Sequence, residues 1–191
     1  MAKFFGNLNA VIGAGFAALV LVYLTLTPDP ATPAWAILTF FHVLVSIMWI
    51  GLLYYFNFVQ IPTMPSVPAE LKPGVSKYIA PKALFWFRWA ALATVLFGLA
   101  VAGHKHYLAQ ALTFETGYRV IGLGMWLGII MAINVWFVIW PNQKRALGIV
   151  EADADTKAKS ATTAMMFSRT NCLLSIPMLY CMVVHGLGGA A

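Results

Sequence analysis

Five long apolar runs constrain the fold of this chain more than any other feature of its sequence. A helix needs about 20 apolar residues to cross a hydrocarbon core about 30 Å thick. The strands of a membrane barrel alternate in polarity and do not produce such runs. The sequence therefore predicts an all-α integral membrane bundle of about five transmembrane helices, over residues 8–26, 33–61, 83–103, 118–140 and 163–187.

The composition leaves little room for a water-soluble part. Of the 191 residues, 61% are hydrophobic and 9% are charged, whereas a soluble domain has about 25% charged residues. We therefore expect a single transmembrane domain over residues 1–191. The first run is longer than the apolar core of a signal peptide, and no clear cleavage site precedes Pro28, so we expect this run to be a retained span.

Prolines and charges mark the expected boundaries between the spans. Five prolines occur between residues 62 and 81, which predicts a connection there, because proline lacks the N–H that a helix interior uses. For the same reason we expect Pro141 to end the fourth helix. The charged segment 151–159 is expected to be a solvated loop before the fifth span.

The distribution of lysine and arginine predicts the orientation. With the N-terminus in the cytoplasm, eight of these residues fall in cytoplasmic segments, whereas only Lys105 and Arg119 fall in outer segments. Because cytoplasmic loops carry the excess of positive charge, we expect the N-terminus inside and the C-terminus outside. The net charge of +6 then lies mainly at the inner face, with anionic membrane lipid as its partner. Nucleic-acid binding is not expected, because no soluble basic face is present.

Polar side chains inside the spans are the candidate functional residues, because each is costly to place in lipid. All four histidines lie on the predicted outer side, and His42 lies about two turns inside its helix. Arg88, Arg169, Asn57 and Asn171 lie toward the inner side and could form an anion-binding or polar site. No Asp or Glu occurs within a predicted span, which argues against a carboxylate proton relay.

Helical spacing places many of these residues on two faces, because positions three or four residues apart share a face of a helix. One face carries His42, Ser46, Trp49, Leu53, Asn57 and Gln60, and another carries Ser168, Asn171, Ser175, Met178, Met182 and His185. In lipid, both faces are expected to turn toward other helices. Such stripes also serve ordinary helix packing, so they do not define a site alone.

The two arginines within the spans each have two interpretations. Arg88 and Arg169 could extend to the headgroups of the inner leaflet and pack their stems against lipid. Arg169 is followed by Thr170 and Asn171, which favours a polar site where the planar guanidinium holds an anion in a bidentate contact.

Four motifs resemble one known membrane family. In chain order they are MWIGLLYYFNFVQIP (48–62), ALFWFRW (83–89), NVWFVIWPNQK (134–144) and SRTNCLLSIPML (168–179). Together they resemble the N-terminal membrane domain of bacterial membrane-bound urate oxidase (urate hydroxylase). The resemblance implies a multi-pass protein of the bacterial inner membrane. In that family a cytochrome c domain follows the membrane domain. No C-x-x-C-H motif occurs here, so we expect a short form without that domain.

A second resemblance implies a haem site. The segment HVLVSIMWIGLLYY (42–55) resembles the first-helix motif of the membrane protoporphyrinogen oxidase of the haem pathway, in which the matching histidine is associated with haem b. The resemblance implies that His42 binds haem b, with Trp49 beside it.

The other haem contacts are expected at the outer end of the bundle. His185 is the expected second axial ligand, because two histidines on facing helices suit an electron carrier. His104 is a rival for this position, and Arg119 could pair with a haem propionate.

We therefore expect a membrane haem b protein that exchanges electrons with a periplasmic partner, such as a cytochrome c or a larger membrane redox complex. Two other interpretations stay open. The chain could be a cofactor-free accessory subunit of a larger oxidase or respiratory complex, or an oxidoreductase that acts on urate or a related purine, with Arg88 or Arg169 holding the anion. A copper site of His and Met side chains is a further alternative, because imidazole and thioether suit copper.

Overall fold

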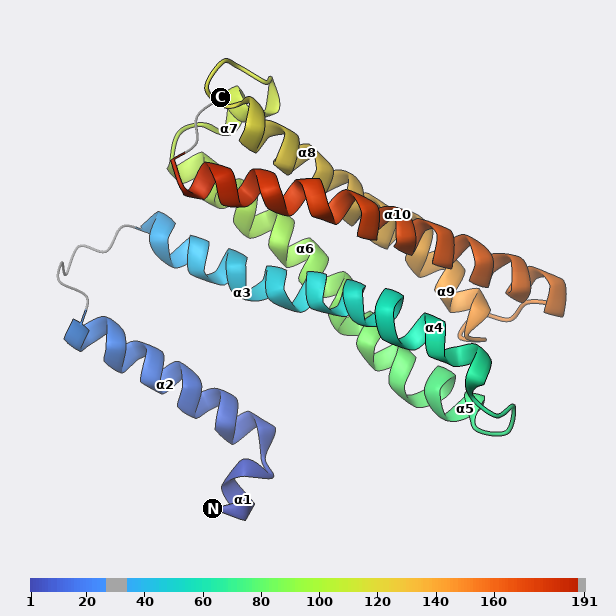
Figure 1. Cartoon of the computed structure of the whole chain (residues 1–191). Coiled ribbons are helices and arrows are strands. Elements are labelled where there is room, and N and C mark those ends of the chain that lie inside the picture. The colour runs from blue at the N-terminus through green and yellow to red at the C-terminus, as the bar shows by residue number, and fades with distance from the viewer. Residues whose placement is uncertain (27–33, 189–191) are drawn as a thin grey trace.

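The computed structural model describes residues 1–26 and 34–188, and nearly all of them are helical (Figure 1). The elements are α1 (Ala2–Phe5), α2 (Leu8–Leu26), α3 (Ala34–Tyr54), η1 (Tyr55–Gln60), α4 (Ile61–Thr63), η2 (Met64–Ser66), α5 (Lys72–Gly74), η3 (Val75–Ile79), α6 (Ala80–His104), α7 (Leu108–Leu112), α8 (Arg119–Ile133), η4 (Asn134–Ile139), α9 (Trp140–Ala146) and α10 (Ala154–Gly186). No strand occurs in these residues.

Five continuous helical stretches are long and apolar enough to cross a membrane. Among the described residues they are Leu8–Thr25, Ala34–Ser66, Lys72–His104, Arg119–Ala146 and Ala154–Gly186. The predicted all-α fold with five spans is therefore confirmed. The predicted start of the second span, Pro33, lies outside the described residues. The orientation across the membrane stays a prediction.

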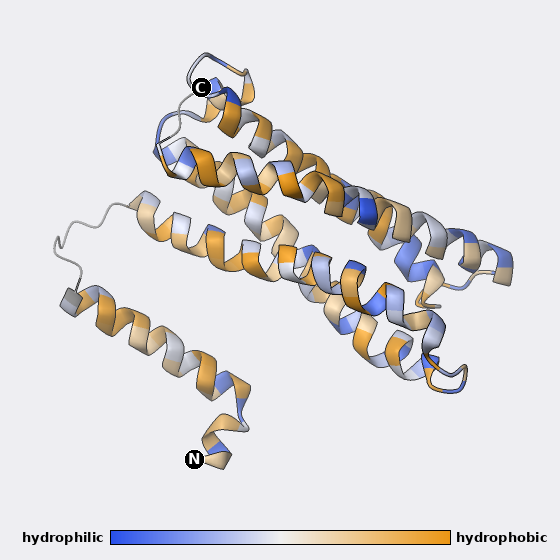
Figure 2. Cartoon of the chain, viewed as in Figure 1, coloured by the Kyte–Doolittle hydropathy of each residue, from blue (hydrophilic) through white to orange (hydrophobic). Residues whose placement is uncertain are grey.

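Four of the five spans form a bundle with a common core. α3 packs along α6, and α10 packs along α8 and α9 (Figure 1). The largest fully buried side chains come from all four spans: Trp49, Leu53, Phe87, Met131, Val135, Ile139, Asn171 and Ser175. Many other large apolar side chains are exposed, and Figure 2 shows hydrophobic residues along the length of every span. Such a surface is matched to lipid, which is as apolar as the side chains.

α2 differs from the other spans because it contributes nothing to this core. None of its residues Leu8–Thr25 is buried, and it lies apart from the bundle in Figure 1. The main site must therefore be built by the other four spans.

The three π-helical segments of the described chain share one sequence feature: each ends two residues before a proline. Pro62 follows η1, Pro81 follows η3 and Pro141 follows η4. A proline ring clashes with the carbonyl four residues earlier in an α-helix. A π turn bonds across five residues and is wider, so it accommodates the ring. Pro141 therefore does not end the fourth helix, contrary to the prediction, and α9 continues that helix to Ala146.

Two other predicted boundaries are wrong for related reasons. The proline-rich segment before residue 83 is helical from Lys72 onward, because Pro73 occupies the first turn of α5, where no N–H is needed, and because the π segment η3 accommodates Pro81. The predicted loop 151–159 mostly belongs to α10, which begins at Ala154. Its N-cap is Asp153, whose carboxylate accepts hydrogen bonds from the Thr156 backbone N–H at 2.8 Å and the Thr156 hydroxyl at 2.7 Å.

Candidate functional site

A cavity of about 570 Å³ lies within the bundle and is called the main cavity below. Four spans line it, through His42, Val43, Ser46, Ile47, Trp49, Ile50, Gly51, Thr94, Val95, Gly98, Leu99, Met125, Gly128, Ile129, Met178, Leu179, Met182 and Val183. Its walls are almost entirely apolar. Ile47 and Val183 are 66% and 59% exposed, so the cavity opens toward the lipid at its α3 and α10 walls.

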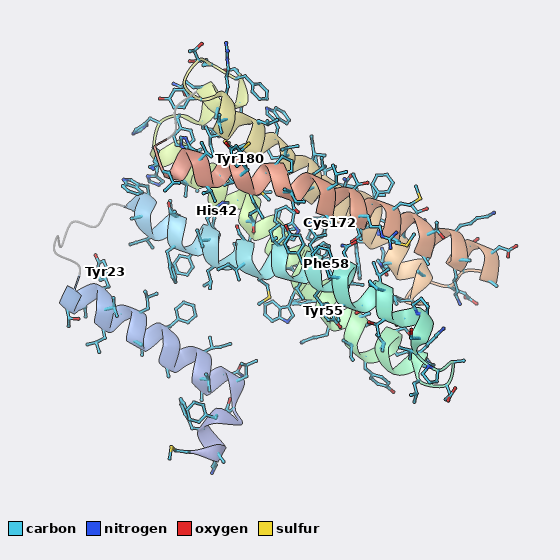
Figure 3. All side chains as sticks on the ribbon, viewed as in Figure 1. Tyr23, His42, Tyr55, Phe58, Cys172 and Tyr180 are labelled. Atoms are coloured by element: carbon cyan, nitrogen blue, oxygen red, sulfur yellow. The ribbon has the colours of Figure 1, made fainter. Side chains whose placement is uncertain are left out.

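His42 is the only lining residue with an imidazole, and its ring is fixed from α6 (Figure 3). The ring atom Nδ1 lies 2.9 Å from the backbone carbonyl oxygen of Thr94. A carbonyl only accepts, so Nδ1 carries the proton and Nε2 keeps a free lone pair. A histidine that ligates a metal is commonly oriented by such a bond to a carbonyl. The geometry therefore leaves Nε2 available as an acceptor or a ligand.

Gly98 makes room for this ring. A Cβ atom at Gly98 would lie 2.9 Å from Cε1 and 3.2 Å from Nδ1 of His42, which is closer than such atoms approach. Sequence reasoning missed both Gly98 and Thr94. Neither could have been found, because a glycine and a threonine are ordinary residues in membrane helices and their relation to His42 depends on helix register.

Trp49 adds a buried donor without a partner. Its side chain is 1% exposed and lines the main cavity, yet its Nε1–H has no hydrogen-bond acceptor. Buried indole N–H groups usually find an acceptor. The predicted inward face of the second span is thus confirmed for His42, Ser46, Trp49, Leu53 and Asn57, all of which are buried or half-buried.

The structure does not bring His185 into the main cavity. His185 is half-buried near the end of α10, and its ring makes an edge contact with Tyr107 at a centroid distance of 5.2 Å. Three residues earlier on α10, Met182 lines the cavity, and a three-residue step is about 4.5 Å along a helix. Val183, two residues before His185, also lines the cavity, so His185 lies outside the cavity and less than one turn beyond its wall.

His104 and Arg119 also lie away from the main cavity. His104 is exposed at the end of α6. Arg119 is exposed at the start of α8, and its guanidinium donates to the Phe114 carbonyl at 3.4 Å and to the Thr116 hydroxyl at 3.5 Å. The soft potential ligands that share the cavity with His42 are instead three methionines, Met125, Met178 and Met182.

A second group of polar side chains is buried between η1, η4 and α10 and is called the polar layer below. Three side-chain hydrogen bonds define it: Asn57–Ser168 at 2.9 Å, Asn134–Asn171 at 3.0 Å and Tyr54–Ser175 at 3.0 Å. Asn171 also donates to the Met131 carbonyl at 2.9 Å. Asn57 and Asn171 therefore belong to a polar cluster, and in it they join helices together.

The polar layer contains unpartnered acceptors at its edge. Oδ1 of Asn57 and Oε1 of Gln60 are buried without a hydrogen-bond partner. A small cavity of about 40 Å³ adjoins Gln60 and is also lined by Gln143 and Ser168. A cavity of this size with polar groups in its lining can hold water, which would satisfy Oε1 of Gln60.

Neither arginine joins the polar layer. The Arg88 guanidinium lies over the Trp140 ring, with Cζ 3.9 Å from the ring centroid. Arg169 is exposed, as is Thr170, while Asn171 is buried on the opposite side of α10.

Within the described residues, no group of three or more His, Cys, Asp or Glu side chains could hold a metal ion. Cys172 and Cys181 are free thiols.

Comparisons with known proteins agree with the family resemblance. Searches of curated proteins and of solved structures each gave no match. A family model described as "Urate oxidase N-terminal" matches residues 109–188, which include α8, α9 and α10 but not His42 or Trp49. The predicted resemblance is therefore confirmed over this part of the chain. The protein is a helical membrane protein, and its residues 109–188 carry the sequence pattern of the urate oxidase N-terminal family.

Proposed function

We propose that the chain is a membrane haem b protein that transfers electrons, with His42 as an axial ligand. The observation that carries the proposal is the hydrogen bond from Nδ1 of His42 to the Thr94 carbonyl, because it leaves Nε2 free beside a large apolar cavity. Haem b, when bound, supplies one-electron chemistry whose potential depends on its axial ligands and on burial.

The residues of the main cavity fit this group in three ways. The volume of about 570 Å³ lies within the range of about 300–1,000 Å³ that is common for ligand pockets. The apolar walls suit a hydrophobic ring system. The unpartnered Nε1–H of Trp49 would donate to a polar atom of the bound group.

The second protein ligand of the haem iron could be His185 or a methionine of the cavity. His185, the ligand expected from the sequence, does not line the cavity and would have to approach from beyond its wall. Met178 and Met182 already line the cavity, and a thioether is an established axial ligand to haem iron that raises its potential. The structure thus favours a methionine over His185, and changing each of these residues separately would identify the ligand.

Two sequence resemblances also support the proposal. The resemblance of residues 42–55 to a haem-associated motif concerns the same histidine. The family model concerns a membrane domain that, in the urate oxidases it resembles, precedes a cytochrome c domain. We therefore propose a cytochrome c or a larger redox complex as the electron partner at the outer end.

The proposal is tested on protein purified from cells supplied with haem precursors. We expect a Soret band that shifts on reduction. His42→Gly should lose haem, and free imidazole should restore the spectrum by filling the space of the missing ring. His106→Asn is the matched control, because His106 is exposed and its backbone φ of 58° suits asparagine.

Three results would contradict the proposed haem b function. A His42→Gly protein with full haem content and an unchanged low-spin spectrum would overturn the assignment of His42. A colourless wild-type protein would overturn haem binding. It would leave the accessory-subunit interpretation and a copper site of His42 with the cavity methionines, which metal analysis would distinguish. Turnover of urate with an added cytochrome c would instead support the purine oxidase interpretation.

A further inference from the structure

Three cations gather over two aromatic rings where α6 begins and α9 ends, and this group is called the cationic cluster. Nζ of Lys82 lies 5.9 Å from the centroid of the Phe85 ring. Cζ of Arg88 lies 5.4 Å from the same ring and 3.9 Å from that of Trp140. Nζ of Lys144 lies 5.7 Å from the Trp140 ring. Arg88 therefore links the two spans, with a lysine on either side.

The cationic cluster has no counterion on its own helices. No Asp or Glu occurs between Glu70 and Glu115, nor between Glu115 and Glu151, so neither α6 nor α9 carries an acid. Cation–π contacts stabilise such cations only modestly and leave their charge in place. Three positive charges close together repel one another, so an anion that bridges them would bind favourably.

The stacking of Arg88 prepares its guanidinium for such an anion. The guanidinium lies over the Trp140 ring, and a guanidinium held in this way presents N–H donors that suit a bidentate contact with a phosphate. The backbone of the same residue is fixed, because Trp136 Nε1–H donates to the Arg88 carbonyl at 3.0 Å. Arg88 is half-buried, and its own side chain makes no contact with the polar layer.

Exposed aromatic side chains continue from the cationic cluster into the span. Trp89 packs edge-on against Trp136 at a centroid distance of 5.2 Å and is 46% exposed. Trp86 and Phe137 are 48% and 75% exposed. The surface is thus charged at one end and apolar along its length, which is the polarity of a phospholipid molecule.

We propose that the cationic cluster binds the phosphate headgroup of an anionic phospholipid, whose acyl chains lie on the aromatic surface of α6 and η4. Basic pockets between transmembrane helices on the cytoplasmic side are known to hold such headgroups, and the orientation predicted from the loop charges puts this end of the bundle at the cytoplasmic face. A free phosphate would gain nothing from the aromatic surface. With three cations present, a headgroup with two phosphates binds more tightly than one with a single phosphate. This proposal is independent of haem binding.

The test is native mass spectrometry of the whole protein, extracted from vesicles of phosphatidylcholine that contain equal small amounts of phosphatidylglycerol and diphosphatidylglycerol. We expect retention in the order diphosphatidylglycerol, phosphatidylglycerol, phosphatidylcholine. Lys144→Gln and Arg88→Gln should each lower retention of the anionic lipids by about tenfold or more, the loss of one charge-assisted hydrogen bond to the headgroup, which exceeds the roughly fivefold effect of any single basic residue near an anionic surface. Arg145→Gln is the matched control. It removes the same charge from the adjacent exposed position, which has no ring contact.

Two results would overturn the proposal. Equal retention of phosphatidylcholine and the anionic lipids would mean that the site does not recognise phosphate charge. An equal loss in Lys144→Gln and Arg145→Gln would mean that lipid responds to the net charge of the surface and not to the cationic cluster. Lys144→Gln keeps the test valid if Arg88→Gln fails to fold, because the hydrogen bonds at Lys144 use its backbone carbonyl, which accepts from Ile149 and Val150 and is kept in the variant.

Discussion

The main cavity and the polar layer lie in the same bundle, yet they differ in nearly every physical respect. The cavity is large, apolar and open toward lipid, with one oriented imidazole. The polar layer is closely packed, and its asparagines and serines bond from helix to helix. The difference indicates a division of roles: the polar layer holds the helices together, and the cavity is left free to bind. Changes in the polar layer should therefore affect stability, and changes in the cavity should affect binding.

The largest effect on stability is expected for Asn171→Leu. Asn171 is fully buried, donates to the Met131 carbonyl and accepts from Asn134. The substitution leaves the half-buried Asn134 amide without its acceptor and removes the second bond to the Met131 carbonyl, which keeps its backbone bond within the helix. We therefore expect a loss of about 2 kcal/mol in the free energy of unfolding, measured by titration with a denaturing detergent. Thr170→Val is the control on the exposed side of α10. Equal losses in the two variants would remove the distinction between the polar layer and the rest of the helix.

Gly98→Ala should affect the cavity more than the fold. The added Cβ would displace the His42 ring and weaken its bond to Thr94. Because the clash involves a side chain that can move, we expect about 1 kcal/mol of destabilisation and a clear loss of bound haem. Gly103→Ala, at a position with free space around it, should retain haem. Unchanged haem content in Gly98→Ala would contradict the proposed position of the His42 ring.

Tyr54→Phe should give a smaller change. It removes the hydroxyl that lies 3.0 Å from Ser175 Oγ. Ser175 keeps its bond to the Cys172 carbonyl, so nothing charged or strongly polar is left unpaired. Hydrogen bonds between membrane helices contribute about 0.6 kcal/mol on average, and we expect a loss of that size in the same detergent titration. A loss as large as that of Asn171→Leu would mean that the polar layer acts as one cooperative unit.

The smallest effect is expected at the N-cap of α10, outside both regions. The hydrogen bonds from Thr156 hold the pKa of Asp153 below its usual value. A depressed pKa means that the cap contributes stability above the ordinary pKa of aspartate and loses it as pH falls through the folded value. In Asp153→Asn, which keeps a capping oxygen without the charge, this acid-dependent change in helix content should disappear from circular dichroism spectra. A persistent change would assign it to another carboxylate.

The sequence predicts the fold of this protein well because the bilayer imposes a length on every span. Apolar runs identified all five spans, and helical spacing identified the inward faces that include Trp49, Asn57 and Asn171. The boundaries at Pro81 and Pro141 were wrong because π turns allow a proline inside a long helix, and a proline alone does not distinguish a π turn from the end of a helix. His42 could be selected because an imidazole inside an apolar helix is unusual. Its relation to Gly98, and the separation of His185 from the cavity, depend on how far one helix is displaced along another.

The π segments also determine how this chain must be aligned with its relatives. A π turn contains about one residue more than the α turn that it replaces, and each residue of an α-helix rotates the chain by about 100°. Each side chain of α9, which follows η4, therefore points in a different direction from the one it would have if residues 119–146 formed a continuous α-helix. The difference is about the rotation of one residue. A relative without a proline at the position of Pro141 is expected to lack one residue between 134 and 141. Aligned without that gap, its residues would be compared with the wrong face of this helix.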